Sequence, residues 1–217
     1  MFESATLRHA VPKEDYEREV ATLRTALLTA QRTLGMQKPF AVLVLIAGVE
    51  SAGKSETVNL LNEWMDPRFI ETSGFVLPTE EESAHPPMWR FWRALPPRGR
   101  IGIFFGAWHT APIVQRAMGE IGAGSFDRHV AEILQMERML HDEGVLLLKY
   151  WFHLSKEQQR KRLKALEKDE PGRVTRAEWK NHRLYDDFVH VTEPFLRRTS
   201  SRQAPWLVVP GVEARYR

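Results

Sequence analysis

The sequence predicts an α/β fold in which a mainly parallel sheet lies between layers of helices. Three apolar runs, at residues 40–47, 101–105 and 145–152, have the length and unbroken hydrophobicity of strands buried on both faces. Segments with helical periodicity separate these runs. Strands that alternate with helices are the pattern of a parallel sheet, so we expect one α/β unit.

The first helix is expected over residues 14–34, where apolar residues recur at spacings of three and four. Gly35 and Pro39 are expected to end it. The strand at 40–47 is followed by a glycine-rich turn and a helix that reaches about Met65. Residues 69–100 are expected to form turns and one short aromatic helix. Between the second and third strands, helices are expected at about 112–118 and 125–142.

Two capping boxes open charged helices after the third strand. Ser155 with Gln158 starts a helix to about residue 168, and Thr175 with Glu178 starts one that reaches toward residue 187. Pro194 is expected to divide this second helix from a further short turn of helix. A last strand is expected at 206–209. The domains are thus an N-terminal helix at 1–38 and an α/β domain at 39–217.

The composition excludes several classes of function. The chain has 217 residues, with 31 Lys and Arg, 28 Asp and Glu, and no cysteine. Disulfides, thiolate metal sites and a cysteine nucleophile are therefore excluded. The N-terminus lacks the apolar run of a signal peptide, and no apolar run approaches the roughly 18 residues of a membrane helix. We expect a cytoplasmic protein with no membrane partner.

Positive charge is concentrated near the C-terminal end. Residues 160–202 hold twelve Lys and Arg against seven Asp and Glu, a local net charge of +5. Such a segment favours a polyanionic partner. An ordinary solvated pair of helices has the same composition, so the charge alone leaves both interpretations open.

A phosphate-binding loop follows the first strand. Residues 48–55, GVESAGKS, match G-x-x-x-x-G-K-[ST] in full, between a buried strand and a helix. The backbone amides of such a loop surround phosphate, the lysine adds positive charge, and the serine hydroxyl can face Mg²⁺. The fold expected is a P-loop kinase-like three-layer sandwich with a basic helical lid. The predicted phosphate-binding residues are Gly48, Ser51, Ala52, Gly53, Lys54, Ser55 and Glu56.

Glu50 is an unusual residue inside this loop, because an acid beside phosphate is repelled unless a metal or a proton offsets it. It either binds Mg²⁺ or handles a proton, or its side chain simply points outward. We therefore predict Lys54 and Glu50 as catalytic, and Glu50 and Ser55 as metal ligands. His85 and His109 stand alone in the sequence, which predicts ordinary polar roles for them.

From about Pro39 to Arg217 the chain resembles the polyphosphate kinase 2 family, particularly its two-domain polyphosphate:AMP phosphotransferases. The most specific motifs are LKYW at 148–151, SKEQQRKR at 155–162 and APW at 204–206. The resemblance implies Mg²⁺, polyphosphate and an adenine nucleotide as partners, with AMP converted to ADP, and no nucleic acid. It also implies a lid at about 155–202 whose cations bind polyphosphate: Arg160, Lys161, Arg162, Lys180 and Arg183.

The chain departs from this family after its second strand. Phe105, Gly106 and Ala111 stand where the family has an Asp and two Arg residues. Phosphoryl transfer depends on positioned charge, so their loss predicts weakened catalysis. The chain thus resembles a degenerate N-terminal half whose gene product continues into a second P-loop domain. Two alternatives remain: a non-catalytic structural or regulatory half, which could also form a homo-oligomer, and another P-loop nucleotide kinase.

Overall fold

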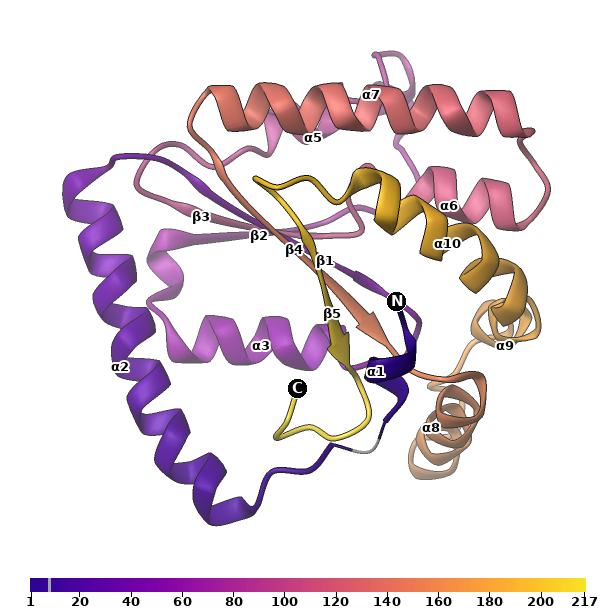
Figure 1. The fold of residues 1–217 in the computed structure, drawn as a ribbon, viewed down its shortest axis with the longest axis horizontal. Helices are drawn as coiled ribbons and strands as arrows, with labels where there is room; N and C mark the ends of the chain where they lie inside the picture. The colour runs from indigo at the N-terminus through magenta and orange to yellow at the C-terminus, as the bar shows by residue number, and fades with distance from the viewer. Residues whose placement is uncertain (8) are drawn as a thin grey trace.

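The computed structural model describes residues 1–7 and 9–217, which form a three-layer α/β sandwich (Figure 1). The sheet has the spatial order β2-β3-β1-β4-β5, and every neighbouring pair is parallel. The predicted fold class is therefore confirmed. The strands are β1 (Val42–Gly48), β2 (Ile70–Gly74), β3 (Ile101–Phe105), β4 (Leu146–His153) and β5 (Trp206–Pro210).

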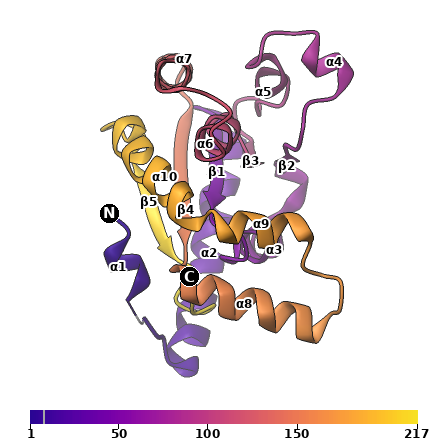
Figure 2. The ribbon, with the colours of Figure 1, turned by 90° about the vertical axis from the view of Figure 1, so that its right-hand side faces the viewer.

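Helices cover both faces of this sheet (Figure 1). On one face lie α2 (Lys13–Gln37) and α3 (Lys54–Trp64), and on the other α5 (Trp89–Arg93), α6 (Thr110–Ala117), α7 (Ala123–Asp142) and α10 (Tyr185–Thr199). Three short helices, α1 (Glu3–Thr6), η1 (Pro67–Phe69) and α4 (Glu80–Ser83), complete these layers. The predicted lid consists of α8 (Lys156–Asp169) and α9 (Arg176–Arg183), which lie side by side near the carboxyl ends of β1 and β4 (Figure 2).

Strand β1 forms the centre of the core because it is paired on both edges and covered on both faces. Leu43 and Leu45 pack in the cluster under α6, α7 and α10, whereas Val44 and Ile46 pack in the cluster under α2 and α3. Alternate side chains of a strand point to opposite faces, so a strand between two helical layers must be apolar at every position. This arrangement explains the unbroken apolar run in the sequence.

Strand β2 was not expected, and the reason lies in its position. It forms one edge of the sheet, and of its residues only Ile70 is buried. A strand that buries one side chain has no apolar run, so its sequence, IETSG, resembles a turn region. Pairing with β3 makes it a strand.

Two expected helix boundaries were wrong. Helix α2 passes through Gly35 to Gln37 and ends at Lys38, which adopts a left-handed conformation with φ 48°. Helix α10 continues through Pro194 rather than stopping there. A proline removes one helical hydrogen bond, but buried side chains on α10, including Phe195 and Leu196, hold this helix against the core.

The N-terminal segment at 1–38 contains two helices rather than one. Phe2, at the start of α1, is buried in the core cluster beneath α6, α7 and α10. The segment before α2 is thus part of the same folded body as the sheet. Among the residues that the structure describes, no helix is both long and apolar enough to cross a bilayer.

Candidate phosphate-binding site

The phosphate loop lies at the carboxyl end of the central strand, between the last residue of β1 and the start of α3. Gly48 has a φ of 137°, and a Cβ at this position would clash with the carbonyl oxygen of Phe152 on β4. Only glycine lets the chain leave the sheet so close to its neighbour. Gly53, with a φ of 90°, immediately precedes α3. The free amides of the first turn of α3 therefore point into the loop, where they favour an anion.

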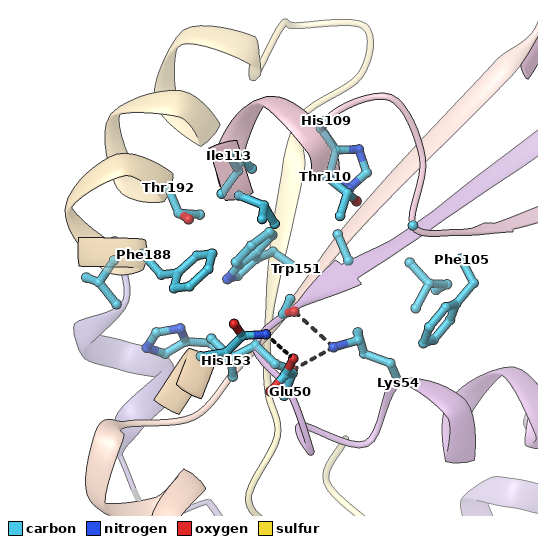
Figure 3. Close-up of a pocket in the computed structure, with 18 of the residues that line it drawn as sticks. Glu50, Lys54, Phe105, His109, Thr110, Ile113, Trp151, His153, Phe188 and Thr192 are labelled. Carbon is cyan, nitrogen blue, oxygen red and sulfur yellow. Dashed lines mark hydrogen bonds between the residues drawn. The ribbon is translucent and has the colours of Figure 1, made fainter. Parts of the chain in front are cut away.

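The side chain of Lys54 folds back over this loop (Figure 3). Its Nζ donates hydrogen bonds to the carbonyl oxygens of Gly48, at 2.9 Å, and Val49, at 2.7 Å. Burial lowers the pKa of Lys54 to about 8, against an attraction to Glu50 that raises it. The ammonium group is therefore charged at neutral pH, and its third N–H is available to a phosphate oxygen.

Glu50 turns toward the lid rather than into solvent. Its Oε1 accepts a hydrogen bond from Asn181 Nδ2 on α9 at 2.7 Å (Figure 3), and its buried Oε2 has no hydrogen-bond partner among the described residues. Burial raises the pKa of Glu50, although Asn181 and Lys54 both act to lower it. An outward orientation is therefore excluded, whereas a role in binding metal or handling a proton stays a prediction.

Ser55 and Glu56 lie in the first turn of α3, and both are exposed. The Glu56 carboxylate accepts hydrogen bonds from Arg162 on α8, at 2.6 and 2.9 Å, and is also paired with Arg217. Its side chain is thus engaged by two arginines, which leaves its backbone amide as the group offered to an anion. No contact of the Ser55 hydroxyl is seen, and its role as a metal ligand stays a prediction.

The residues present do not form a ready magnesium site. In the part of the chain that the structure describes, no group of three or more His, Asp or Glu side chains is close enough to hold a metal ion. Phe105 occupies the end of β3, with the Lys54 Nζ 5.9 Å from its ring centroid. Gly106 has a φ of 79°, and a Cβ there would lie 2.9 Å from the carbonyl oxygen of Phe75. The turn after β3 is therefore built for glycine and not for the arginine of the family motif.

The lid is closed onto the loop by contacts that charge counting does not reveal. Besides the bond from Asn181 to Glu50, the Gln159 amide donates to the Glu50 carbonyl oxygen at 3.4 Å. Asn181 and Gln159 carry no charge, so a search for cations passes over them. Only the Arg162 contact to Glu56 had a signal in the sequence, and that signal pointed to polyphosphate rather than to an acid of this chain.

The five predicted lid cations differ in what they contact. Arg162 pairs with Glu56, and Lys161 pairs with Glu157 on its own helix at 2.6 Å. The other three are exposed and form no ion pair with any described residue; they are Arg160, Lys180 and Arg183. These three side chains are free to bind a polyanion, and that role stays a prediction.

A cavity of about 400 Å³ opens beside Lys54 and Glu50. Its wall is largely apolar and aromatic, with Ile113 from α6, Trp151 from β4 and Phe188 from α10 (Figure 3). The sequence did not predict this cavity, because its residues come from five separate segments. It also shows that the space next to the phosphate loop is poor in positive charge.

Comparisons with known proteins agree with this geometry. Residues 10–217 match the family described as Polyphosphate kinase 2 (PPK2). The chain is 52% identical over 219 residues to the polyphosphate:AMP phosphotransferase of Pseudomonas aeruginosa, and 49% identical over 220 residues to that of Pseudomonas syringae. Each alignment covers 100% of this chain and 44% of the relative, so the chain spans less than half their length.

A solved structure supports the same relationship. The crystal structure of polyphosphate kinase 2 from Arthrobacter aurescens matches with a TM-score of 0.90 at 28% identity, over 99% of this chain and 77% of that one. The sheet order, the loop after β1 and the lid helices therefore have a counterpart of known structure. From these matches, the chain belongs to the polyphosphate kinase 2 family.

Proposed function

We propose that this protein transfers a phosphoryl group between polyphosphate and AMP to give ADP, and that the part described here binds phosphate with weakened catalysis. The observation that carries the proposal is the phosphate loop, with Lys54 held over it at the centre of a parallel sheet. The relatives named polyphosphate:AMP phosphotransferase support the choice of substrates.

Each group of residues has a separate part in this reaction. The loop amides and Lys54 bind the terminal phosphate and offset the charge that develops on it. The exposed cations Arg160, Lys180 and Arg183 hold the rest of the polyanion through charge alone. Mg²⁺, which neutralises phosphate oxygens in such reactions, stays a prediction, because the described residues form no ready site for it.

A second candidate function is favoured by Phe105 and Gly106. Phe105 supplies no metal ligand, and the backbone at Gly106 disfavours the family's arginine. This part of the protein would then be a structural or regulatory half, with catalysis in a second P-loop domain or in an oligomer. Family membership disfavours the third alternative, a different P-loop nucleotide kinase. A cytoplasmic location also stays a prediction from the sequence.

Two measurements on this chain test the proposal. Titration calorimetry with tripolyphosphate should show binding that Lys54→Ala weakens at least about tenfold, because a charge-assisted contact is lost. Lys13→Ala is the matched control, since Lys13 is an exposed lysine on α2, away from the loop. ADP formation from AMP, polyphosphate and Mg²⁺ should be slow.

The possible results separate the candidate functions. If tripolyphosphate does not bind, the phosphate-binding role is wrong. Rapid ADP formation that Lys54→Ala abolishes would contradict weakened catalysis and favour a fully active domain. Binding without any ADP formation would favour the structural or regulatory half.

A further inference from the structure

Unpaired polar atoms gather around the cavity beside the phosphate loop. Seven buried side-chain polar atoms have no hydrogen-bond partner among the described residues, and all but Arg90 Nε belong to residues that line this cavity. Buried polar groups in folded proteins are nearly always paired, so such a concentration needs an explanation. The atoms are Glu50 Oε2, His109 Nδ1 and Nε2, Trp151 Nε1, His153 Nδ1 and Thr192 Oγ1.

These groups are neutral hydrogen-bonding groups rather than charges. His109 is 1% exposed, and burial lowers its pKa to about 3, helped by repulsion from Lys149. A neutral imidazole has one N–H donor and one acceptor nitrogen, and neither is used here. Trp151 adds a donor, and the Thr192 hydroxyl both donates and accepts. His109 comes from the turn before α6, Trp151 from β4 and Thr192 from α10 (Figure 3).

The rest of the wall is suited to a flat ring. Trp151 and Phe188 present aromatic surface to the cavity, and Phe2 lies stacked on His153 with ring centroids 4.1 Å apart. Aromatic walls of this kind bury planar ligands through apolar contact and ring stacking. An aliphatic ligand would fill the volume but would leave the unpaired nitrogens and hydroxyl unsatisfied.

Charge excludes a polyanion from this space. Lys54 is the one Lys or Arg among the residues that line the cavity, and its Nζ already binds two loop carbonyls. Glu50 lines the cavity as well and opposes any further negative charge. A chain of phosphates beside Ile113, Trp151 and Phe188 would be desolvated without partners, at a high cost in free energy. The occupant is therefore uncharged where it contacts this wall.

We propose that the cavity binds an uncharged bicyclic heteroaromatic ring through hydrogen bonds to His109, Trp151 and Thr192. This site goes beyond the phosphate-binding role and does not depend on it, because it uses the wall formed by α6, β4 and α10. A ligand here would contact both the sheet and α10, which immediately follows the lid helix α9. Its binding would thus stabilise the closed arrangement seen in the structure.

Three probes of nearly equal shape test this site: benzimidazole has a donor and an acceptor nitrogen, indole has a donor alone, and indene has neither. The readout is the Trp151 indole N–H signal in ¹⁵N–¹H spectra of the whole chain, identified among the seven tryptophans by Trp151→Phe. Benzimidazole should shift this signal and bind about tenfold more tightly than indene, because it makes one or two hydrogen bonds that indene cannot make. Indole should lie between them.

Two variants identify the location of the site. Thr192→Val removes the hydroxyl at almost constant shape and should weaken benzimidazole about fivefold, the effect of one ordinary hydrogen bond. Val189→Trp adds bulk at the cavity wall and should abolish binding. If Val189→Trp does not fold, Thr192→Val alone still tests the site.

Several results would overturn the inference. Equal affinity for indene and benzimidazole would show an apolar hollow without hydrogen-bond selection. Failure of all three probes would mean that solvent satisfies these atoms, and unchanged binding in both variants would place the probe elsewhere. Tripolyphosphate, added separately, reports on the loop through the amide signals of Gly53 and Lys54, so failure of one site is distinguishable from failure of the other.

Discussion

At the scale of single residues, the environment of Lys54 determines how the phosphate loop works. Its ammonium group is buried, which lowers its pKa to about 8, whereas the nearby Glu50 stabilises the charged form. The two carbonyl oxygens that accept its hydrogen bonds fix its direction before any phosphate arrives. Such preorganisation reduces the entropy lost on binding. The same burial makes the charge of this lysine sensitive to mildly alkaline pH.

The affinity for tripolyphosphate should therefore fall as the pH rises from 7 to 9. The protonated lysine binds the anion, and with a pKa of about 8 roughly nine-tenths of it is neutral at pH 9, so the expected loss is about tenfold. Calorimetry across this range measures the loss. Lys54→Arg keeps its charge throughout and should remove most of the dependence. Parallel curves for the two proteins would contradict a titrating Lys54.

At the scale of secondary-structure elements, the lid is a pair of helices held to the loop by few contacts. Helices α8 and α9 begin with capping boxes at Ser155 and Thr175, so their start points are set locally. Their attachment is not local, because Asn181 bonds Glu50 and Arg162 bonds Glu56. Elements joined to the body by a few polar contacts open at low free-energy cost. The lid is therefore the part of this fold most suited to move when phosphate binds.

Replacing Asn181 should loosen α9. In Asn181→Ala, the Glu50 carboxylate loses its hydrogen bond to the lid, which is worth about 1–1.5 kcal/mol. Amide hydrogen exchange within α9 should become about five- to tenfold faster by mass spectrometry. Lys180→Ala, at the exposed neighbouring position, is the control and should leave exchange unchanged. Equal exchange in both variants and the wild type would mean that other contacts hold the lid.

At the scale of the whole molecule, a buried ion pair connects the sheet to two helices. Lys149 of β4 has a fully buried side chain, and its Nζ lies 2.6 Å from Glu137 Oε2 on α7 and 2.6 Å from the carbonyl oxygen of Thr199 at the end of α10. Trp108 Nε1 donates to the other oxygen of Glu137 at 3.2 Å. Both charges are thus paired and hydrogen-bonded, which a buried ion pair requires.

Removing one charge of this pair should strongly destabilise the fold. Glu137→Gln leaves Lys149 buried without its counter-charge, and the free energy of unfolding should fall by about 3–5 kcal/mol in urea titrations. The double variant Glu137→Leu with Lys149→Met should recover much of this loss, because no charge then remains buried. Glu132→Gln makes the same chemical change at an exposed position of α7 and serves as control. A loss below about 1 kcal/mol in Glu137→Gln would show that the pair is dispensable.

Much of the fold was predictable because its signals are local. Strands β1, β3, β4 and β5 and the loop from Gly48 to Ser55 appear as apolar runs and a spaced motif, and the capping boxes appear as four-residue patterns. Strand β2 was missed, because an edge strand buries too little to need apolar residues. The helix through Pro194 was misjudged, because packing of its buried side chains outweighs the lost hydrogen bond.

By itself, the sequence determined the fold class, the phosphate loop and the loss of the family's acidic and basic residues after β3. Each of these depends on neighbouring residues, and local physical chemistry interprets neighbours reliably. The tertiary structure alone decided that Asn181 holds Glu50, that Glu56 pairs with arginines, and that unpaired polar atoms surround a cavity. These features join residues up to 161 positions apart, as for Glu56 and Arg217. Partners at such separations meet only when the whole chain has packed.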